Sequence, residues 1–182
     1  MKKLFFVLAV ILAFEGSAQT AAAIPADQVI NDALAIATKE KKKVFVMFHA
    51  SWCGWCHKMD ASMNDETCKK LFEENFVIRH LVVDEAKDKK HLENPGASEL
   101  RDKYYGKDQG IPFWLVFDNN GKLLFDSKSR KEGDGMEQGE NVGCPATEKE
   151  VSYFINVLKN STKMKEAELD LIRKRFRQNE SR

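Results

Sequence analysis

The sequence predicts an α/β domain with a mixed sheet and helices on both faces of that sheet. Apolar runs rich in β-branched and aromatic residues occur at 44–49, 76–83 and 113–117, which suits buried strands. Segments with helical spacing of apolar residues separate these runs, and strands connected through helices tend to pair in parallel. The Asn120-Gly121 dipeptide predicts a hairpin to a fourth strand, which adds an antiparallel pair.

The first half of the chain supplies two strands and the helices around them. Pro25 suits a helix start, and apolar residues recur after it at helical spacing as far as Ala37. A second helix is expected over 53–62, directly after the first strand. A third helix, capped at 64–65, is expected to contain Cys68.

The second half adds the hairpin and three more helices. Charged residues at 85–93 predict a surface insertion, and a short helix over 98–105 follows it. Residues 127–146 are polar and contain four glycines, which predicts a long loop of a kind that often carries function. The Thr-x-x-Glu capping box at 147–150 predicts the start of a helix, and a last helix is expected over 162–177.

The amino-terminus has the features of a secretory signal peptide. Lys2 and Lys3 precede an apolar run of eleven residues at 4–14, and the small residues of a cleavage site follow at 16–18. Such a run is too short to span a membrane. We therefore expect residues 1–18 to be removed and the protein to be exported, periplasmic or secreted, without stable membrane insertion. An uncleaved anchor is the alternative.

The charge balance gives no indication of a nucleic-acid partner. The chain has 29 Lys and Arg against 28 Asp and Glu. Loss of residues 1–18 removes two lysines and one glutamate, which leaves 27 residues of each sign. A neutral domain lacks the basic excess that attracts nucleic acid or an anionic membrane.

Cys53 and Cys56 carry the clearest chemical signal. They have two residues between them and stand where a helix is expected to begin after a buried strand. A helix N-terminus favours a thiolate on the first cysteine, and the second can attack a mixed disulfide formed there. Cys68 and Cys144 could pair with each other, stay reduced or relay electrons, and the sequence leaves this open.

The motif Trp-Cys-Gly-Trp-Cys at 52–56, placed after an apolar strand, resembles the thioredoxin family. Gly-Ile-Pro at 110–112 and the later hairpin follow in the order of that family. The resemblance covers about residues 26–160. It implies a thioredoxin-like mixed sheet in a domain at 19–160. The last helix lies outside the family pattern, and we assign it to a C-terminal helical extension at 161–182.

The resemblance also implies thiol–disulfide exchange with protein thiols and disulfides, without a cofactor. Cys53 matches the exposed nucleophile of the family, and Cys56 matches the buried resolving cysteine. Pro112 matches the cis-proline beside the cysteines. There the backbone of Ile111 would pair with an extended substrate peptide.

The chain departs from the family pattern at two points. Met47 stands where thioredoxin has a buried aspartate, so His49, His57 or a water would have to accept the proton of Cys56. The dipeptide between the cysteines is Gly-Trp rather than Gly-Pro, and the family tunes its reduction potential through this pair. Since neither residue is charged or carries an imidazole, we expect a reductase, supplied with electrons by a membrane donor.

Alternative functions remain compatible with the sequence. The chain could be a non-catalytic binding module that uses Trp52, Trp55 and the loop at 127–146 as an interaction surface. Cys-x-x-Cys-His at 53–57 is also the attachment signature of c-type haem. A zinc site is disfavoured because the other two cysteines do not form a second close pair.

Overall fold

The computed structural model describes residues 22–180, so the predicted signal peptide lies outside the described residues. One sheet has the strand order β2-β1-β3-β4. The pair β1·β2 is parallel, whereas β1·β3 and β3·β4 are antiparallel. The prediction of a mixed sheet is confirmed. The strands are β1 (Lys43–His49), β2 (Phe76–Val82), β3 (Phe113–Phe117) and β4 (Leu123–Asp126).

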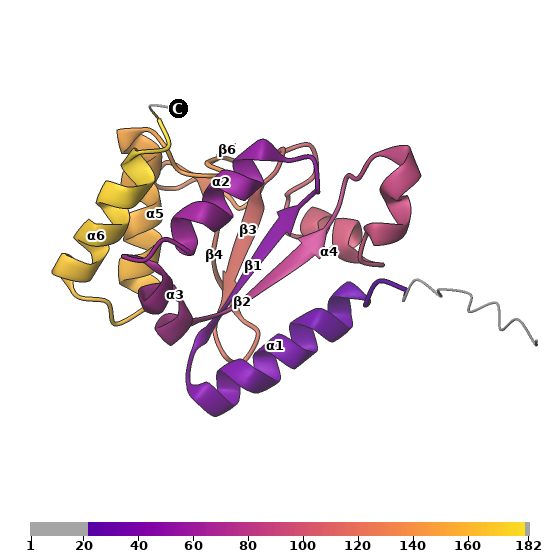
Figure 1. The fold of residues 1–182 in the computed structure, drawn as a ribbon, viewed down its shortest axis with the longest axis horizontal. Helices are drawn as coiled ribbons and strands as arrows, with labels where there is room; N and C mark the ends of the chain where they lie inside the picture. The colour runs from indigo at the N-terminus through magenta and orange to yellow at the C-terminus, as the bar shows by residue number, and fades with distance from the viewer. Residues whose placement is uncertain (1–21, 181–182) are drawn as a thin grey trace, which may run out of the picture.

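Helices cover both faces of this sheet (Figure 1). One face carries α1 (Ala26–Glu40) and α4 (Ala97–Lys103). The other face carries α2 (Gly54–Met63), α3 (Lys69–Asn75), α5 (Glu148–Ser161) and α6 (Glu166–Arg177). A 3-10 helix, η1 (Lys87–Leu92), lies in the exposed insertion after β2. Within residues 22–180, no helix is long and apolar enough to cross a membrane.

Side-chain alternation along β1 divides the interior into two cores. Phe45 and Met47 contribute to the core under α2, α3, α5 and α6. Val44, Val46 and Phe48 contribute to the core under α1 and α4. All five side chains are fully buried because helices cover both faces, as the continuous apolar run predicts.

The C-terminal helix α6 is packed into the first of these cores. Leu169, Ile172 and Phe176 are buried there, as their helical spacing predicts. The ring of Phe176 has its centroid 5.0 Å from that of Phe154 and 6.3 Å from that of Phe72. The extension therefore contributes aromatic packing to the domain.

The last helix begins at Glu166 rather than at 162, and the local predictions at 64–68 and 127–146 also differ from the structure. Asp65 starts a turn rather than a helix, because its carboxylate accepts hydrogen bonds from the N–H and hydroxyl of Thr67. As a result α3 begins after Cys68, which is its N-cap and not part of the helix. The predicted loop at 127–146 contains a two-stranded antiparallel sheet, β5 (Lys128–Ser129) with β6 (Glu140–Asn141).

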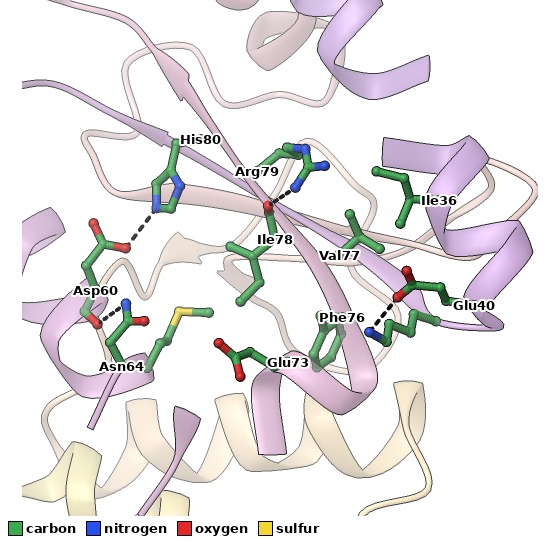
Figure 2. Close-up of a pocket in the computed structure, with 12 residues that line it drawn as sticks. Ile36, Glu40, Asp60, Asn64, Glu73, Phe76, Val77, Ile78, Arg79 and His80 are labelled. Atoms are coloured by element: carbon green, nitrogen blue, oxygen red, sulfur yellow. Dashed lines mark hydrogen bonds and ion pairs between the residues drawn. The ribbon is translucent and has the colours of Figure 1, made fainter. Parts of the chain in front are cut away.

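The edge strand β2 borders a groove that α1, α2 and α3 help to line (Figure 2). The carbonyl of Ile78 accepts a hydrogen bond from the guanidinium of Arg79 at 2.8 Å. At the end of the strand, Asn94 bonds both the N–H and the carbonyl of Val82. These contacts occupy polar groups that would otherwise be open to another strand, which protects the edge.

Candidate active site

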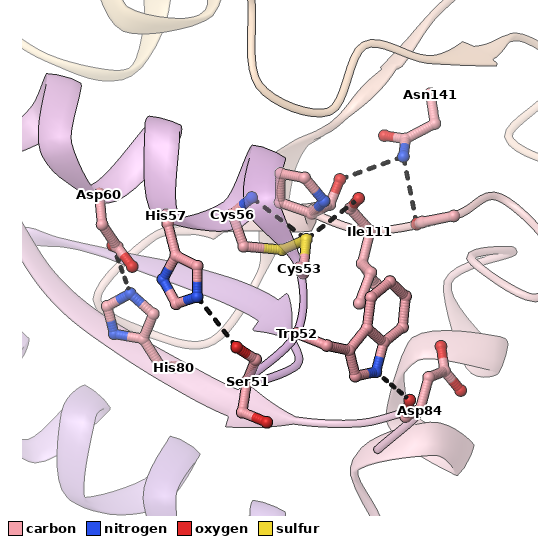
Figure 3. The surroundings of a disulfide bond; sticks show 12 residues. Ser51, Trp52, Cys53, Cys56, His57, Asp60, His80, Asp84, Ile111 and Asn141 are labelled. Carbon is pink, nitrogen blue, oxygen red and sulfur yellow. Dashed lines mark hydrogen bonds and ion pairs between the residues drawn. A yellow bond between two sulfur atoms is a disulfide. The ribbon is translucent and has the colours of Figure 1, made fainter. Parts of the chain in front are cut away.

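Cys53 and Cys56 form a disulfide at the N-terminus of α2 (Figure 3). Their Cα atoms are 5.3 Å apart. Cys53 is the N-cap of the helix, and its Sγ accepts the backbone N–H of Cys56 at 3.1 Å. Once the disulfide is reduced, the same N–H group and the helix dipole favour a thiolate on Cys53.

The two cysteine residues differ slightly in exposure to solvent. Cys53 is 3% exposed, and Cys56 is fully buried. Both pack against Ala50 and Ile111. Cys53 is therefore more enclosed in this oxidised state than the family resemblance implies, but it is the cysteine that keeps some exposed surface.

The Ile111–Pro112 segment borders the disulfide. The carbonyl oxygen of Ile111 lies 3.6 Å from the Sγ of Cys53, and the peptide bond between Ile111 and Pro112 is cis. Asn141 of β6 holds this segment by donating from Nδ2 to the carbonyls of Gln109 and Pro112, at 2.9 and 3.1 Å. The structure thus brings together the cysteines and the Ile-Pro motif, which are far apart in the sequence.

A buried carboxylate fixes the turn before Cys53. Glu85 is 4% exposed and accepts hydrogen bonds from the N–H and hydroxyl of Ser51, at 2.6 and 2.8 Å. Burial acts against the charged form, but the bonds from Ser51, together with the charges of Lys89 and His49, outweigh it and hold the pKa of Glu85 below its ordinary value. The prediction that 85–93 is a surface insertion is wrong for Glu85. The charged run has no periodicity that could have indicated the burial of this residue.

Trp52 and Trp55 are held in exposed positions beside the disulfide. Trp52 is 59% exposed, and Trp55 is 47% exposed. The indole N–H of Trp52 donates to the carbonyl of Asp84 at 2.8 Å. The Nζ of Lys58 lies 4.1 Å from the centroid of the Trp55 ring, which is a cation–π contact. Both rings therefore present apolar surface in a defined orientation.

Three of the four histidines lie near α2 and the ends of β1 and β2. His80 Nε2 is 2.8 Å from Asp60 Oδ1, and the His80 ring is 5.1 Å from that of His49. Burial lowers the pKa of His49, and His80 adds to this effect. His57 Nε2 is 3.0 Å from the Ser51 carbonyl. Within residues 22–180, no three Cys, His, Asp or Glu side chains are arranged to hold a metal ion.

Cys68 and Cys144 are free and buried. Burial raises the pKa of both thiols, that of Cys144 to about 12. Both are therefore protonated at neutral pH, and a protonated thiol is a poor nucleophile. Their environments suit packing in the core rather than exchange.

A family model described as thioredoxin-like matches residues 26–119, which is more than half of the chain. This chain belongs to the thioredoxin-like family. The family accounts for the order of β1, the cysteine pair, β2 and the Ile-Pro segment. It also explains why a disulfide stands at the start of α2. The matched region ends before the loop at 127–146 and before α6.

Several solved structures are similar to this chain. A disulphide isomerase from Xylella fastidiosa Temecula1 is 24% identical, with a TM-score of 0.46, over 65% of this chain and 80% of that one. A Thermus thermophilus thioredoxin is 17% identical, with a TM-score of 0.45, over 76% and 85%. The oxidised C-terminal domain of Neisseria meningitidis DsbD is 21% identical, with a TM-score of 0.40, over 58% and 84%. No curated protein matches the sequence.

Proposed function

We propose that this thioredoxin-like protein is a thiol–disulfide oxidoreductase that reduces disulfides in exported proteins. The observation that carries the proposal is the Cys53–Cys56 disulfide at the N-cap of α2. The pair combines one residue that keeps 3% of its surface exposed, Cys53, with one that is fully buried, Cys56. That asymmetry suits a nucleophile and a resolving cysteine.

The reaction takes place on the reduced protein. The Cys53 thiolate attacks one sulfur of a substrate disulfide, which forms a mixed disulfide and releases a substrate thiolate that takes up a proton. Cys56 then loses its proton and attacks the Sγ of Cys53. This step re-forms the Cys53–Cys56 bond and releases the second substrate thiol. Two electrons have then passed from the protein dithiol to the substrate.

The residues between the cysteines support the reductase direction, and the expected compartment supports an external electron donor. Neither Gly54 nor Trp55 supplies a charge that would strongly stabilise the Cys53 thiolate. A dithiol that is not stabilised in this way is the better reductant. In an oxidising compartment the disulfide must be reduced again after each turnover. We propose a membrane reductase as the donor of these two electrons.

The substrate binds over the exposed side of the disulfide. Trp52 and Trp55 present apolar surface there. The backbone of Ile111, next to Pro112, lies beside Cys53 and can pair with an extended peptide. In this proposal the four residues orient the substrate disulfide toward Cys53.

Insulin reduction with dithiothreitol as the electron donor tests the proposal. The wild-type protein should accelerate the reduction of insulin, and Cys53→Ser should abolish this activity. Cys56→Ser that is first reduced and then freed of dithiothreitol should accumulate a mixed disulfide with insulin, because the resolving thiol is missing. Turnover by Cys53→Ser at the wild-type rate would show that the proposed nucleophile is wrong.

The exposed indoles of Trp52 and Trp55 also support a second candidate, a binding module without turnover. A module would retain its partner equally well after both cysteines are changed to serine, and the wild-type protein would not reduce insulin. The haem alternative has less support. Both cysteine sulfurs are bonded to each other, and the His57 ring is engaged with the Ser51 carbonyl.

A further inference from the structure

The loop at 127–146 and the segment that follows α6, for which the family pattern gives no role, both contribute to one groove. This groove of about 370 Å³ is also lined by Trp55 and Pro112, which flank the cysteine pair, and by Cys144. Residues 141–144 come from β6 and the end of this loop, and Glu180 follows α6. Parts of the chain outside the matched family region therefore contribute to a groove at the candidate active site.

One buried side chain joins the wall of this groove to α2. Asn179 is 6% exposed, and its Nδ2 donates to the carbonyl of Pro145 at 3.2 Å and to the hydroxyl of Ser62 at 3.0 Å. The same nitrogen lies 3.5 Å from the Sγ of Cys144. Ser62 belongs to α2, the helix that begins at the disulfide. The amide therefore fixes residues 144–145 relative to that helix.

Arg177, the last residue of α6, holds the next residue of the wall. The guanidinium of Arg177 donates from Nη1 to the carbonyl of Ala146, and it forms ion pairs with Glu148 and Glu180. Elsewhere along the wall, the indole N–H of Trp114 donates to the carbonyl of Gly143 at 2.9 Å. Without Arg177 and Asn179 the carbonyls of Ala146 and Pro145 would lose these partners, and this end of the wall would be held less firmly.

We propose that Arg177 and Asn179 are positioning residues that set this groove against the disulfide and so favour polypeptide disulfides over small ones. The inference rests on the oxidoreductase function proposed above. A small disulfide needs only to reach the Cys53 sulfur. A polypeptide also binds along the neighbouring groove, so the groove must be held in the conformation that accepts it. Preorganisation of that groove lowers the cost of binding.

The test compares two substrates of the reduced, full-length mature protein. Oxidation is followed by tryptophan fluorescence with insulin and, separately, with hydroxyethyl disulfide, over a range of concentrations. For Asn179→Leu and for Arg177→Met, the ratio of the two second-order rate constants, insulin over hydroxyethyl disulfide, should fall about fivefold, or ~1 kcal/mol. The insulin concentration that gives half of the maximal rate should rise, whereas the maximal rate with insulin should stay unchanged. Arg177→Lys should recover much of the ratio, because lysine retains a donor.

Arg173→Met is the matched control. Arg173 lies one turn earlier on α6 and pairs with the exposed carboxylates of Glu148 and Asp170. We expect this variant to keep the wild-type ratio. Asn179→Leu could fail to fold, which urea unfolding would show. In that case the result for Arg177→Met tests the proposal, since the Arg177 side chain is only partly buried.

The outcomes separate this inference from the function on which it rests. Wild-type exchange with both substrates, combined with an unchanged ratio in the variants, overturns the positioning role alone. Equal losses toward both substrates overturn it as well, because they indicate damage to the disulfide itself. If the wild-type protein reacts with neither substrate, the proposed function fails, and the inference fails with it.

Discussion

Among single residues, the four cysteines differ most clearly in reactivity. After reduction, brief treatment with iodoacetamide at neutral pH should label Cys53 first, because it caps α2 and keeps some exposure. Cys56 is fully buried, and burial raises the pKa of Cys68 and Cys144. Mass spectrometry of the peptides measures the order, and unfolded protein should be labelled at all four positions. Labelling of Cys56 as fast as Cys53 would contradict the assigned roles.

Glu85 provides a test of the turn that precedes the nucleophile. Its folded pKa is held below the ordinary value, so its carboxylate stabilises the fold above the unfolded pKa, and this stabilisation is lost as pH falls through the folded pKa. Glu85→Gln should lower the free energy of unfolding at neutral pH by about 2 kcal/mol, through weakened bonds to Ser51.

Urea unfolding at several pH values checks this expectation. The difference between wild type and Glu85→Gln should shrink as pH falls below about 4, where carboxylates take up protons. The exposed Glu66→Gln is the control and should show little effect at any pH. A difference for Glu85→Gln that does not change with pH would show that the charge of Glu85 is not the cause.

Residue-scale prediction from the sequence worked where the chemistry lies in adjacent residues. Cys53 and Cys56 were identified because their spacing is itself the signal, and the structure shows them bonded. Glu85 and Asn179 were missed because their partners, Ser51 and Ser62, are distant in the sequence. An isolated Glu or Asn in a polar segment shows no pattern that distinguishes a buried side chain, bonded to a distant segment, from a solvated one.

At the scale of elements, long periodic segments were predicted well and short ones were not. The apolar runs gave β1 and β3 closely, and the capping box at 147–150 gave the start of α5. The strands β5 and β6 have two residues each, too few to show alternation. The antiparallel pairing of β3 with β1 also depends on tertiary packing, since the connecting helix alone favours a parallel pair.

The helix α6 can be tested as a part of the core. Phe176→Ala should lower the free energy of unfolding by about 3–5 kcal/mol, because it removes a fully buried ring that contacts Phe72 and Phe154. Leu171→Ala, on the exposed side of the same helix, should change it by no more than about 0.5 kcal/mol. Equal effects in urea unfolding would show that α6 is not part of the cooperative unit.

For the molecule as a whole, the features outside the matched family region converge on one place. The loop after β4 contributes Asn141, which holds the Ile111–Pro112 segment, and the turn after α6 contributes Asn179, which bonds the carbonyl of Pro145. Two contacts from outside the matched family region thus lie close to the segments around the cysteine pair. They support the groove proposed above.

Export is the remaining proposal at this scale, because it sets the redox environment in which the disulfide acts. When the full chain is expressed in a bacterium and recovered from the periplasm, its intact mass should match a polypeptide that begins at Gln19 with the Cys53–Cys56 disulfide formed. The physical reason is the apolar run at 4–14 followed by small residues, which a signal peptidase can cleave. Leu8→Arg interrupts that run and should leave the full-length chain in the cytoplasm. A membrane-bound chain of full length would indicate an uncleaved anchor, and a mass excess equal to haem would replace disulfide exchange with haem attachment.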